Sequence, residues 1–167
     1  LGDVYKRQLQ GAGIRRFLLP DTLGILNPLQ CVEYLRKMLK RYPDTHFDFH
    51  AHNDYDLSVS NSLAAVLSGA KGLHVTVNGL GERCGNAPLA SVQVILKDMF
   101  HAHTNIHEEM LNDVSRLVEG YSGIAVAPNT PVVGRYVFTQ VAGVHADGDN
   151  KDNLYCNAVS YTHLTLP

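Results

Sequence analysis

One short stretch, HFDFHAHND, constrains the fold and chemistry of this chain more than any other. Its first half alternates apolar and polar residues, with Phe47 and Phe49 on one side, so residues 46–50 are predicted to form a strand. His50 and His52 then share one face of that strand, where both imidazoles can reach a single metal ion. The stretch therefore predicts a strand that ends at a metal site.

A second polar motif, NGLGERCGN at residues 78–86, follows the next apolar segment along the chain. Its glycines predict a tight loop, and its Glu82 and Asn86 add oxygen donors to the two imidazoles. Asn86 also precedes Ala-Pro, a pattern typical of a helix N-cap. Nitrogen and oxygen donors together suit a divalent ion that acts as a Lewis acid.

Strands and helices are predicted to alternate through the first hundred residues. Asn27 followed by a proline predicts a capped helix start, and Asp21 is expected to order the turn before it. Short connections between the elements favour a parallel sheet with crossover helices. Periodicity alone leaves open whether that sheet is an open doubly wound sheet or part of a barrel; both place active sites at the carboxyl ends of strands. The predicted elements are strands at 14–19, 46–50 and 73–77, and helices at 28–42, 57–68 and 87–100.

The pair HAHND and NGLGERCGN, at this spacing, resembles the signature of the 2-isopropylmalate synthase and homocitrate synthase family. Citramalate synthases share this signature, and hydroxymethylglutaryl-CoA lyase is a more distant relative. The resemblance implies that His50, His52 and Asn86 bind a divalent metal ion such as Mg²⁺, Mn²⁺ or Zn²⁺. It also places Glu82 near that ion and its waters, as a catalytic residue.

The same resemblance assigns substrate-binding residues elsewhere. Thr22, in the PDT motif, is expected to bind the carboxylate of a 2-oxo acid. Asn78, Gly79 and Gly81 lie in the loop near which the family's acyl-CoA passes. His145, in AGVHADG, is expected to take part in acid–base catalysis and can reach the site of a partner subunit.

The resemblance also implies the domain organisation. Residues 9–103 are expected to form about the last three β/α units of a (β/α)8 TIM barrel, and residues 104–157 a helical linker subdomain. Residues 1–8 and 158–167 resemble translated sequencing-adaptor sequence and are excluded from the fold. A whole barrel needs roughly 200–250 residues, so this 167-residue chain is expected to be inactive and poorly stable by itself.

The linker subdomain is expected to begin with a helix. Asn105 is predicted to cap it, with Glu108 three residues on completing a capping-box-like pair, and Gly120 is predicted to end it. Met110, Leu111, Val114, Leu117 and Val118 would form its apolar face.

The implied reaction joins acetyl-CoA to a 2-oxo acid, with 2-oxoisovalerate favoured, as in leucine biosynthesis. Homocitrate and citramalate synthesis are the alternatives within the family, followed by an acyl-CoA lyase. A metal-dependent amidohydrolase also uses HxH at a barrel strand, but gives NGLGERCGN no natural use. A relative that keeps only the fold would have no need of the metal motif. The full-length enzyme is expected to be a homodimer.

Composition excludes several other classes. The net charge of −2, with no basic run, gives no indication of nucleic-acid binding. No apolar run approaches the ~18 residues that span a membrane. Three widely spaced cysteines argue against a disulfide framework and favour the cytoplasm.

Several local features remain open or are rejected. Asp48, Asn53 and Asp54 are available to orient the two imidazoles. Cys84, in the site loop, is expected to be incidental. A calcium loop at 147–153 is rejected, because a lysine and an aspartate replace a ligand and a glycine. Three further histidines lack acidic or cysteine partners and are expected at the surface: His101, His103 and His107.

Overall fold

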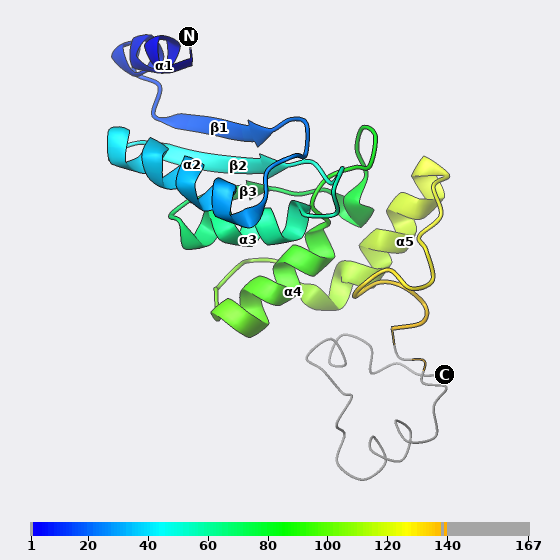
Figure 1. The fold of residues 1–167 in the computed structure, drawn as a ribbon. Helices are drawn as coiled ribbons and strands as arrows, with labels where there is room; N and C mark the ends of the chain where they lie inside the picture. Colours follow the sequence, from blue (N-terminus) through cyan, green and yellow to red (C-terminus); the bar gives the residue numbers. More distant parts are fainter. Residues whose placement is uncertain (1, 138, 140–167) are drawn as a thin grey trace. The chain divides into compact units, whose positions relative to one another are not determined.

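The computed structural model describes residues 2–137 and 139, and only the backbone of residues 2–6. The chain divides into two compact units, Leu1–Ala87 and Pro88–Pro167. Each unit is described by itself (Figure 1). No helix among the described residues is long and apolar enough to cross a membrane.

The first unit is built on a three-stranded parallel sheet in the order β1-β2-β3. Two helices follow the first two strands and lie on the same side of the sheet (Figure 1). This confirms the predicted alternation of strands and crossover helices. The elements are α1 (Gly2–Gly11), β1 (Arg16–Asp21), α2 (Pro28–Arg41), β2 (His46–Ala51), α3 (Ser58–Leu67), β3 (Gly72–His74) and the 3-10 helix η1 (Val77–Gly79).

Alternation along the strands separates an apolar face from a polar one. Leu19, Phe47 and Phe49 are buried against apolar residues of α2 and α3. Residues in register across the other face include His50 and His74, which pair between β2 and β3. The apolar core therefore fixes β2 so that its histidines point away from the helices.

The predicted start of α2 is confirmed. Asn27 accepts a hydrogen bond from the Gln30 backbone N–H at 2.9 Å, and the Gln30 side chain accepts one from the Asn27 N–H at 3.0 Å. This capping box satisfies two of the helix's free N–H groups. The Asp21 carboxylate accepts bonds from the N–H groups of Ile25 and Leu26, so Asp21 orders the turn as predicted.

Small polar residues bring α3 close to its neighbours. Ser58 and Ser62 are buried, and the Ser62 hydroxyl donates to the Ser58 carbonyl, which satisfies it within the helix. Asn61 is fully buried and donates to the Leu26 carbonyl at 2.6 Å. These contacts tie α3 to the loop that follows β1.

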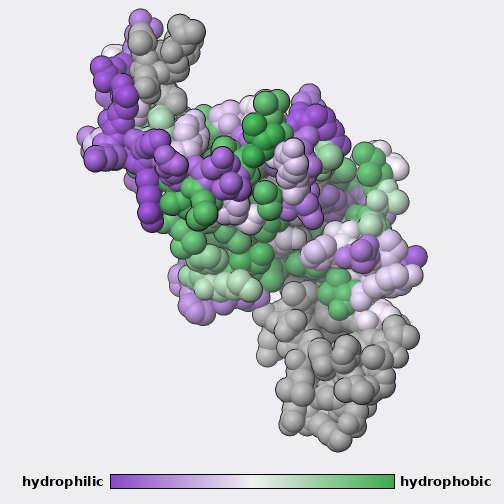
Figure 2. Space-filling model, in the orientation of Figure 1, coloured by the Kyte–Doolittle hydropathy of each residue, from purple (hydrophilic) through white to green (hydrophobic). Residues whose placement is uncertain are grey.

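The second unit contains α4 (Leu89–Phe100), the 3-10 helix η2 (Glu108–Met110) and α5 (Leu111–Ser122). Its described core consists of Ala90, Val94, Leu111 and Val132, with Leu89 and Val133 packed against them. Figure 2 shows how apolar and hydrophilic side chains are distributed over one face of the molecule.

Several predictions about helix and strand ends are wrong. The first strand is predicted at 14–19, but β1 begins at Arg16 and continues through Pro20 to Asp21. β3 ends at His74, because the Thr76 N–H donates to Ala87 and η1 follows. Pro88 rather than Asn86 precedes α4, without a side-chain cap. Asn105 does not cap α5, which begins at Leu111 directly after η2, with Met110 at its N-cap and no side-chain cap. The helix continues past Gly120 to Ser122, and Gly123 ends it with φ of 68°.

The predicted apolar face of α5 is only partly buried. Leu111 is in the core, but Met110 and Leu117 are 52% and 57% exposed. Ser115 is buried instead. The assignment of residues 9–103 to the barrel and of residues 104–157 to a linker subdomain remains a prediction about the full-length protein.

Candidate metal centre

Loops at the carboxyl ends of the three strands carry most of the predicted site residues. The loop after β1 holds Thr22, the loop after β2 begins at His52, and the loop after β3 runs to Asn86. Backbone hydrogen bonds join them: the His52 N–H donates to Asp21, and the Asn53 N–H donates to Gly85 at 3.0 Å. His52 and Asn86 also form an isolated antiparallel bridge. The sequence motifs thus meet at one edge of the sheet, as predicted.

The two predicted histidine ligands lie side by side. The ring centroids of His50 and His52 are 4.9 Å apart, with 75° between their planes. Burial lowers the pKa of His50, and the neighbouring His52 and His74 lower it further. A lowered pKa keeps the imidazole neutral near pH 7, which is the form that binds a metal ion.

A hydrogen bond from its amide nitrogen orients the Asn86 side chain. Asn86 is 7% exposed, and its Nδ2 donates to the Leu80 carbonyl at 3.1 Å. Because a carbonyl can only accept, the amide nitrogen has to face Leu80 and the oxygen has to face away. Gly81 makes room for this arrangement, since a Cβ there would collide with the Asn86 Nδ2.

Each of the three predicted metal ligands has one buried side-chain atom that lacks a hydrogen-bond partner. These atoms are the Nδ1 atoms of His50 and His52 and the Oδ1 of Asn86. Only two other buried side-chain atoms of the described residues share this condition, Asn61 Oδ1 and Thr76 Oγ1. Buried polar atoms without partners are costly and are usually satisfied by a ligand or water. Two imidazoles and an amide oxygen fit a divalent ion.

These three residues do not complete a coordination shell. No group of three or more His, Cys, Asp or Glu side chains in the described part of the chain could hold a metal ion. A metal site here would need the Asn86 amide and further ligands. Such ligands can be water, substrate oxygens or residues outside the described part.

The candidate orienting residues all have other partners. Asp48 accepts from Arg16 Nε at 2.6 Å and from His46 Nε2 at 2.8 Å. Asn53 Oδ1 accepts from the Ser58 N–H and hydroxyl at the start of α3. Asp54 pairs with Arg83.

His74 is a neighbour of the site that sequence reasoning missed. Its ring lies 5.9 Å from that of His50, and its Nε2 is 3.6 Å from an Asp48 oxygen. The signal was present, since His74 lies opposite His50 in a parallel pair, but that register depends on strand pairing. Gly72 lets Asp48 approach, because a Cβ there would collide with its carboxylate.

The predicted substrate-binding loop has a tightly defined backbone. Asn78 and Gly79 have φ of 58° and 68°, in the left-handed region. Gly85 has φ of 82°, and a Cβ there would collide with the Gly79 carbonyl oxygen. These glycines are required by the loop itself, and a substrate role for Asn78, Gly79 and Gly81 stays a prediction.

The remaining residues considered in the sequence analysis differ in their exposure to solvent, and one of them is not described by the structure. The Glu82 side chain is 86% exposed, and Thr22 is exposed with its carbonyl accepting from Arg83. His145 lies outside the described residues. Cys84 is free and exposed. Cys31 is buried, and burial together with the charge of Asp21 raises its pKa to about 12.

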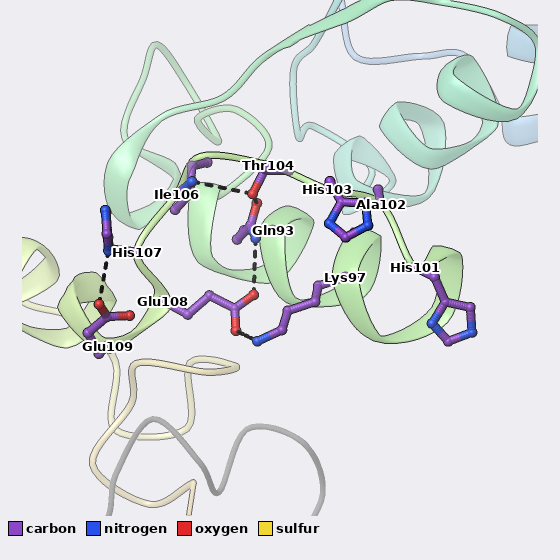
Figure 3. Close-up of a pocket in the computed structure, with 10 residues that line it drawn as sticks. All are labelled: Gln93, Lys97, His101, Ala102, His103, Thr104, Ile106, His107, Glu108 and Glu109. Carbon is purple, nitrogen blue, oxygen red and sulfur yellow. Dashed lines mark hydrogen bonds and ion pairs between the residues drawn. The ribbon is translucent and has the colours of Figure 1, made fainter.

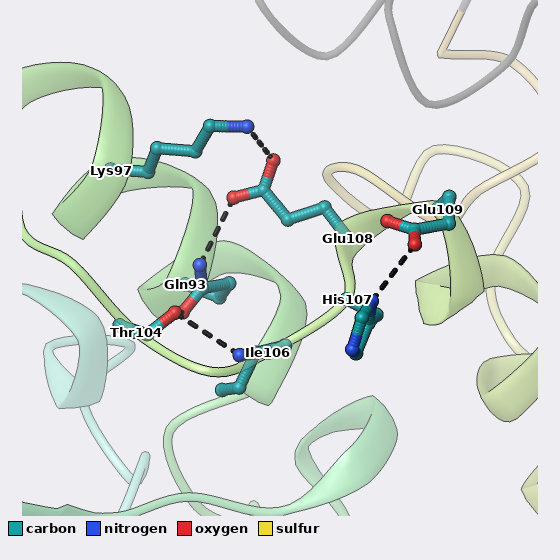
Figure 4. A network of polar contacts seen from close by, with 7 residues as sticks. All are labelled: Gln93, Lys97, Thr104, Ile106, His107, Glu108 and Glu109. Carbon is teal, nitrogen blue, oxygen red and sulfur yellow. Dashed lines mark hydrogen bonds and ion pairs between the residues drawn. The ribbon is translucent and has the colours of Figure 1, made fainter.

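The second unit has a separate pocket of about 440 Å³, lined in part by the histidines expected at the surface (Figure 3). His101, His103 and His107 are all exposed, as predicted. Only His107 among them has a drawn partner, Glu109 at 3.0 Å. Beside them, a half-buried network joins Gln93 to Thr104 and Glu108 (Figure 4).

The chain is similar to known proteins over most of its length. The model of a family described as HMGL-like matches residues 3–118, beginning within the segment expected to be non-native. A homocitrate synthase of Sulfolobus acidocaldarius is 44% identical over 142 residues, covering 85% of this chain. A protein named as a 2-isopropylmalate synthase in Methanopyrus kandleri is 42% identical over 146 residues, covering 87%. The chain spans 29–30% of the length of these relatives.

Solved structures show the same fold. The HMG-CoA lyase of Bacillus subtilis aligns with a TM-score of 0.66 and 26% identity, over 72% of this chain and 42% of that one. The carboxyl transferase domain of Rhizobium etli pyruvate carboxylase aligns with a TM-score of 0.60 at 19% identity, covering 69% of this chain and 19% of that one. The parallel sheet described above is thus part of a barrel.

Proposed function

Because the chain belongs to the HMGL-like family, we propose that it is part of an enzyme that condenses acetyl-CoA with a 2-oxo acid. One observation of the structure supports this most directly. His50 Nδ1, His52 Nδ1 and Asn86 Oδ1 are buried, close together in the fold and without partners. A divalent ion would satisfy all three.

Enzymes of this family generally use a divalent metal ion. His50, His52 and Asn86 would hold it, together with ligands not described here. When bound, such an ion polarises the carbonyl of a 2-oxo acid as a Lewis acid. The Leu80 carbonyl would keep the Asn86 oxygen turned toward the site through its bond to Nδ2.

Other residues would bind substrate and move protons. The Thr22 hydroxyl would donate to the carboxylate of the 2-oxo acid, and the loop at Asn78, Gly79 and Gly81 would contact the acyl-CoA. His145 would take part in removing a proton from the acetyl methyl group. Glu82 would act beside the metal waters.

The 2-oxo acid we favour is 2-oxoisovalerate, which makes the full-length enzyme a cytoplasmic 2-isopropylmalate synthase of leucine biosynthesis. Homocitrate and citramalate synthesis are equally well supported, because the matched relatives carry all three names at 42–44% identity. The family membership gives an amidohydrolase no support.

We also propose that these residues form about the last three units of the barrel and that the full-length enzyme is a homodimer. Leu18 lies on the polar face of the sheet, away from α2 and α3, and is 43% exposed. In a closed barrel this face is filled by side chains of the other strands. A chain without those strands would lack half its core, and we expect it to be inactive alone.

The test is an assay of the full-length protein that carries this chain. CoA release from acetyl-CoA would be measured with 2-oxoisovalerate, 2-oxoglutarate and pyruvate, with and without Mn²⁺. Metal-dependent release with 2-oxoisovalerate as the best substrate is expected. A preference for another acid would move the assignment to a sister synthase, and no release with any acid would refute the condensing activity.

A further inference from the structure

We infer that Arg83 is a positioning residue that ties the loop after β1 to the loops after β2 and β3, and so holds Thr22 in place. Its effect on substrate rests on the proposed function, in which Thr22 binds the 2-oxo acid. The tie itself rests only on contacts within the first unit. No role for Arg83 is predicted from the sequence.

The Arg83 guanidinium contacts two other loops at once. Its Nε and Nη2 donate to the two carboxylate oxygens of Asp54, at 2.8 and 2.9 Å. The same Nη2 donates to the backbone carbonyl of Thr22 at 2.7 Å. Paired bonds of this kind fix both distance and direction, which a lysine ammonium cannot reproduce.

The backbone is shaped to bring these groups together. Arg83 has φ of 57°, a left-handed conformation that few residues other than glycine adopt. Gly24, with φ of 62°, lies so close to Asp54 that an added Cβ would come within 2.9 Å of its backbone nitrogen. Two unusual backbone conformations thus coincide at one contact, which favours a requirement for the contact itself.

Thr22 is the residue that this tie fixes. On one side of it, the Asp21 carboxylate holds the N–H groups of Ile25 and Leu26, at 3.1 Å each. On the other, Arg83 holds the Thr22 carbonyl. The Thr22 side chain is exposed, so the structure fixes it only through its backbone.

The metal ligands are held by different contacts. Asn86 is fixed by Leu80 and by its own N–H bond to Gly79 at 2.9 Å, and the Ala87 N–H donates to Ala51. Removal of Arg83 should therefore weaken binding of the 2-oxo acid while leaving metal affinity nearly unchanged. A merely structural residue would affect both together.

The experiment compares variants of the full-length protein by two readouts. The first is hydrogen exchange of the Gly24, Ile25 and Leu26 amides, which needs no activity. The second is KM for the 2-oxo acid beside KM for acetyl-CoA and the affinity for Mn²⁺. The variants are Arg83→Ala, Arg83→Lys and Asp54→Asn, with Arg36→Ala, an exposed arginine of α2, as control.

For Arg83→Ala we expect exchange about tenfold faster and KM for the 2-oxo acid about tenfold higher, the size expected for loss of a charge-assisted bond. The KM for acetyl-CoA and the Mn²⁺ affinity should change by less than about twofold, which we treat as no change. Arg83→Lys should fall between the wild type and Arg83→Ala, and Arg36→Ala should match the wild type. Asp54→Asn gives the same comparison if Arg83→Ala does not fold.

Unchanged exchange in both Arg83→Ala and Asp54→Asn would overturn the tie. Faster exchange with an equal rise in both KM values would overturn the specific placement of Thr22. If the wild type turns over no 2-oxo acid but exchange responds as expected, the proposed function fails and the tie stands.

Discussion

The two units hold similar polar side chains in opposite states. In the first unit, His50, His52 and Asn86 place buried atoms together without partners. In the second, Gln93 is 3% exposed, yet its nitrogen donates to Glu108 at 3.0 Å and its oxygen accepts from Thr104 at 2.9 Å. The first arrangement leaves polar atoms that a ligand could satisfy, whereas both polar atoms of the Gln93 amide already have partners.

This difference is informative about function, because buried polar groups are usually hydrogen-bonded within the chain. A buried group without such a partner is therefore a candidate for binding a ligand or water. The pocket in Figure 3 is rich in histidine, but its buried Gln93 is already bonded to Glu108 and Thr104. The sequence motifs and the unsatisfied buried atoms both favour the strand ends over this pocket. Substitutions in the two regions should therefore have different consequences.

The largest expected effect is on metal binding. His52→Ala in the full-length protein should weaken Mn²⁺ binding about 100-fold or more, because it removes one of the proposed ligands. Titration calorimetry with Mn²⁺ measures this directly. His101→Ala, at an exposed histidine of the second unit, is the matched control and should leave the affinity unchanged. Equal affinities in the wild type and His52→Ala would remove the distinction between the two regions.

Stability should respond in the opposite region. Gln93→Leu keeps the bulk of the side chain but removes its bonds to Glu108 and Thr104, at a cost of about 1 kcal/mol in free energy of unfolding. Urea denaturation checks this value, and Mn²⁺ affinity should stay unchanged.

Glu109→Gln serves as the control within the same pocket. Its exposed pair with His107 should contribute nothing measurable, so the urea midpoint should stay at the wild-type value. If the Gln93→Leu and Glu109→Gln proteins had the same free energy of unfolding, the hydrogen bonds of Gln93 would not stabilise the fold.

The strand, helix and site of the first unit could be predicted because local patterns specify them. Alternation around Phe47 and Phe49 fixes which face of β2 carries the histidines. The Asn27 capping box depends only on two residues three positions apart, Asn27 and Gln30. Motif spacing placed Asn86 near His52, which the bridge between them confirms.

Contacts that depend on tertiary packing could not be predicted. His74 joins the site through strand register, and Arg83 reaches Thr22 across 61 positions of sequence. The Asn105 cap was wrong because capping residues are also common in loops, and here the 3-10 helix η2 lies between Asn105 and α5. Sequence patterns identify candidate ligands, but not which side chains are already satisfied.

A smaller effect should come from the glycine beside Asn86. In Gly81→Ala, the new methyl group would collide with the Asn86 Nδ2 and turn its oxygen away from the site. We expect about tenfold weaker Mn²⁺ binding, the range seen when a ligand loses its orienting partner.

Gly120→Ala is the matched change in the second unit. No atom lies within 4 Å of the added methyl group, and Gly120 is inside α5, so the free energy of unfolding should rise by about 0.5–1 kcal/mol. If Gly81→Ala instead left metal affinity unchanged, Asn86 would not be a ligand that needs orientation.

The smallest effect should appear in the acid stability of the first unit. Burial raises the pKa of Asp48, but hydrogen bonds from Arg16 and His46 outweigh it, and the net pKa lies below its usual value. The folded state then binds this proton less readily than the unfolded state. The resulting stability is present above about pH 4, the usual pKa of an aspartate, and is lost as the pH falls through the lowered pKa.

Asp48→Asn should remove this part of the pH dependence. Its free energy of unfolding, measured by urea denaturation between about pH 2 and 6, should fall less steeply below pH 4 than that of the wild type. Asp44→Asn, at an exposed aspartate before β2, should retain the wild-type slope. If both variants kept that slope, Asp48 would not be held in its charged form by Arg16 and His46. The hydrogen bonds of Asp48 on the polar face of the sheet would then not stabilise the fold in the way expected of the Gln93 bonds in the second unit.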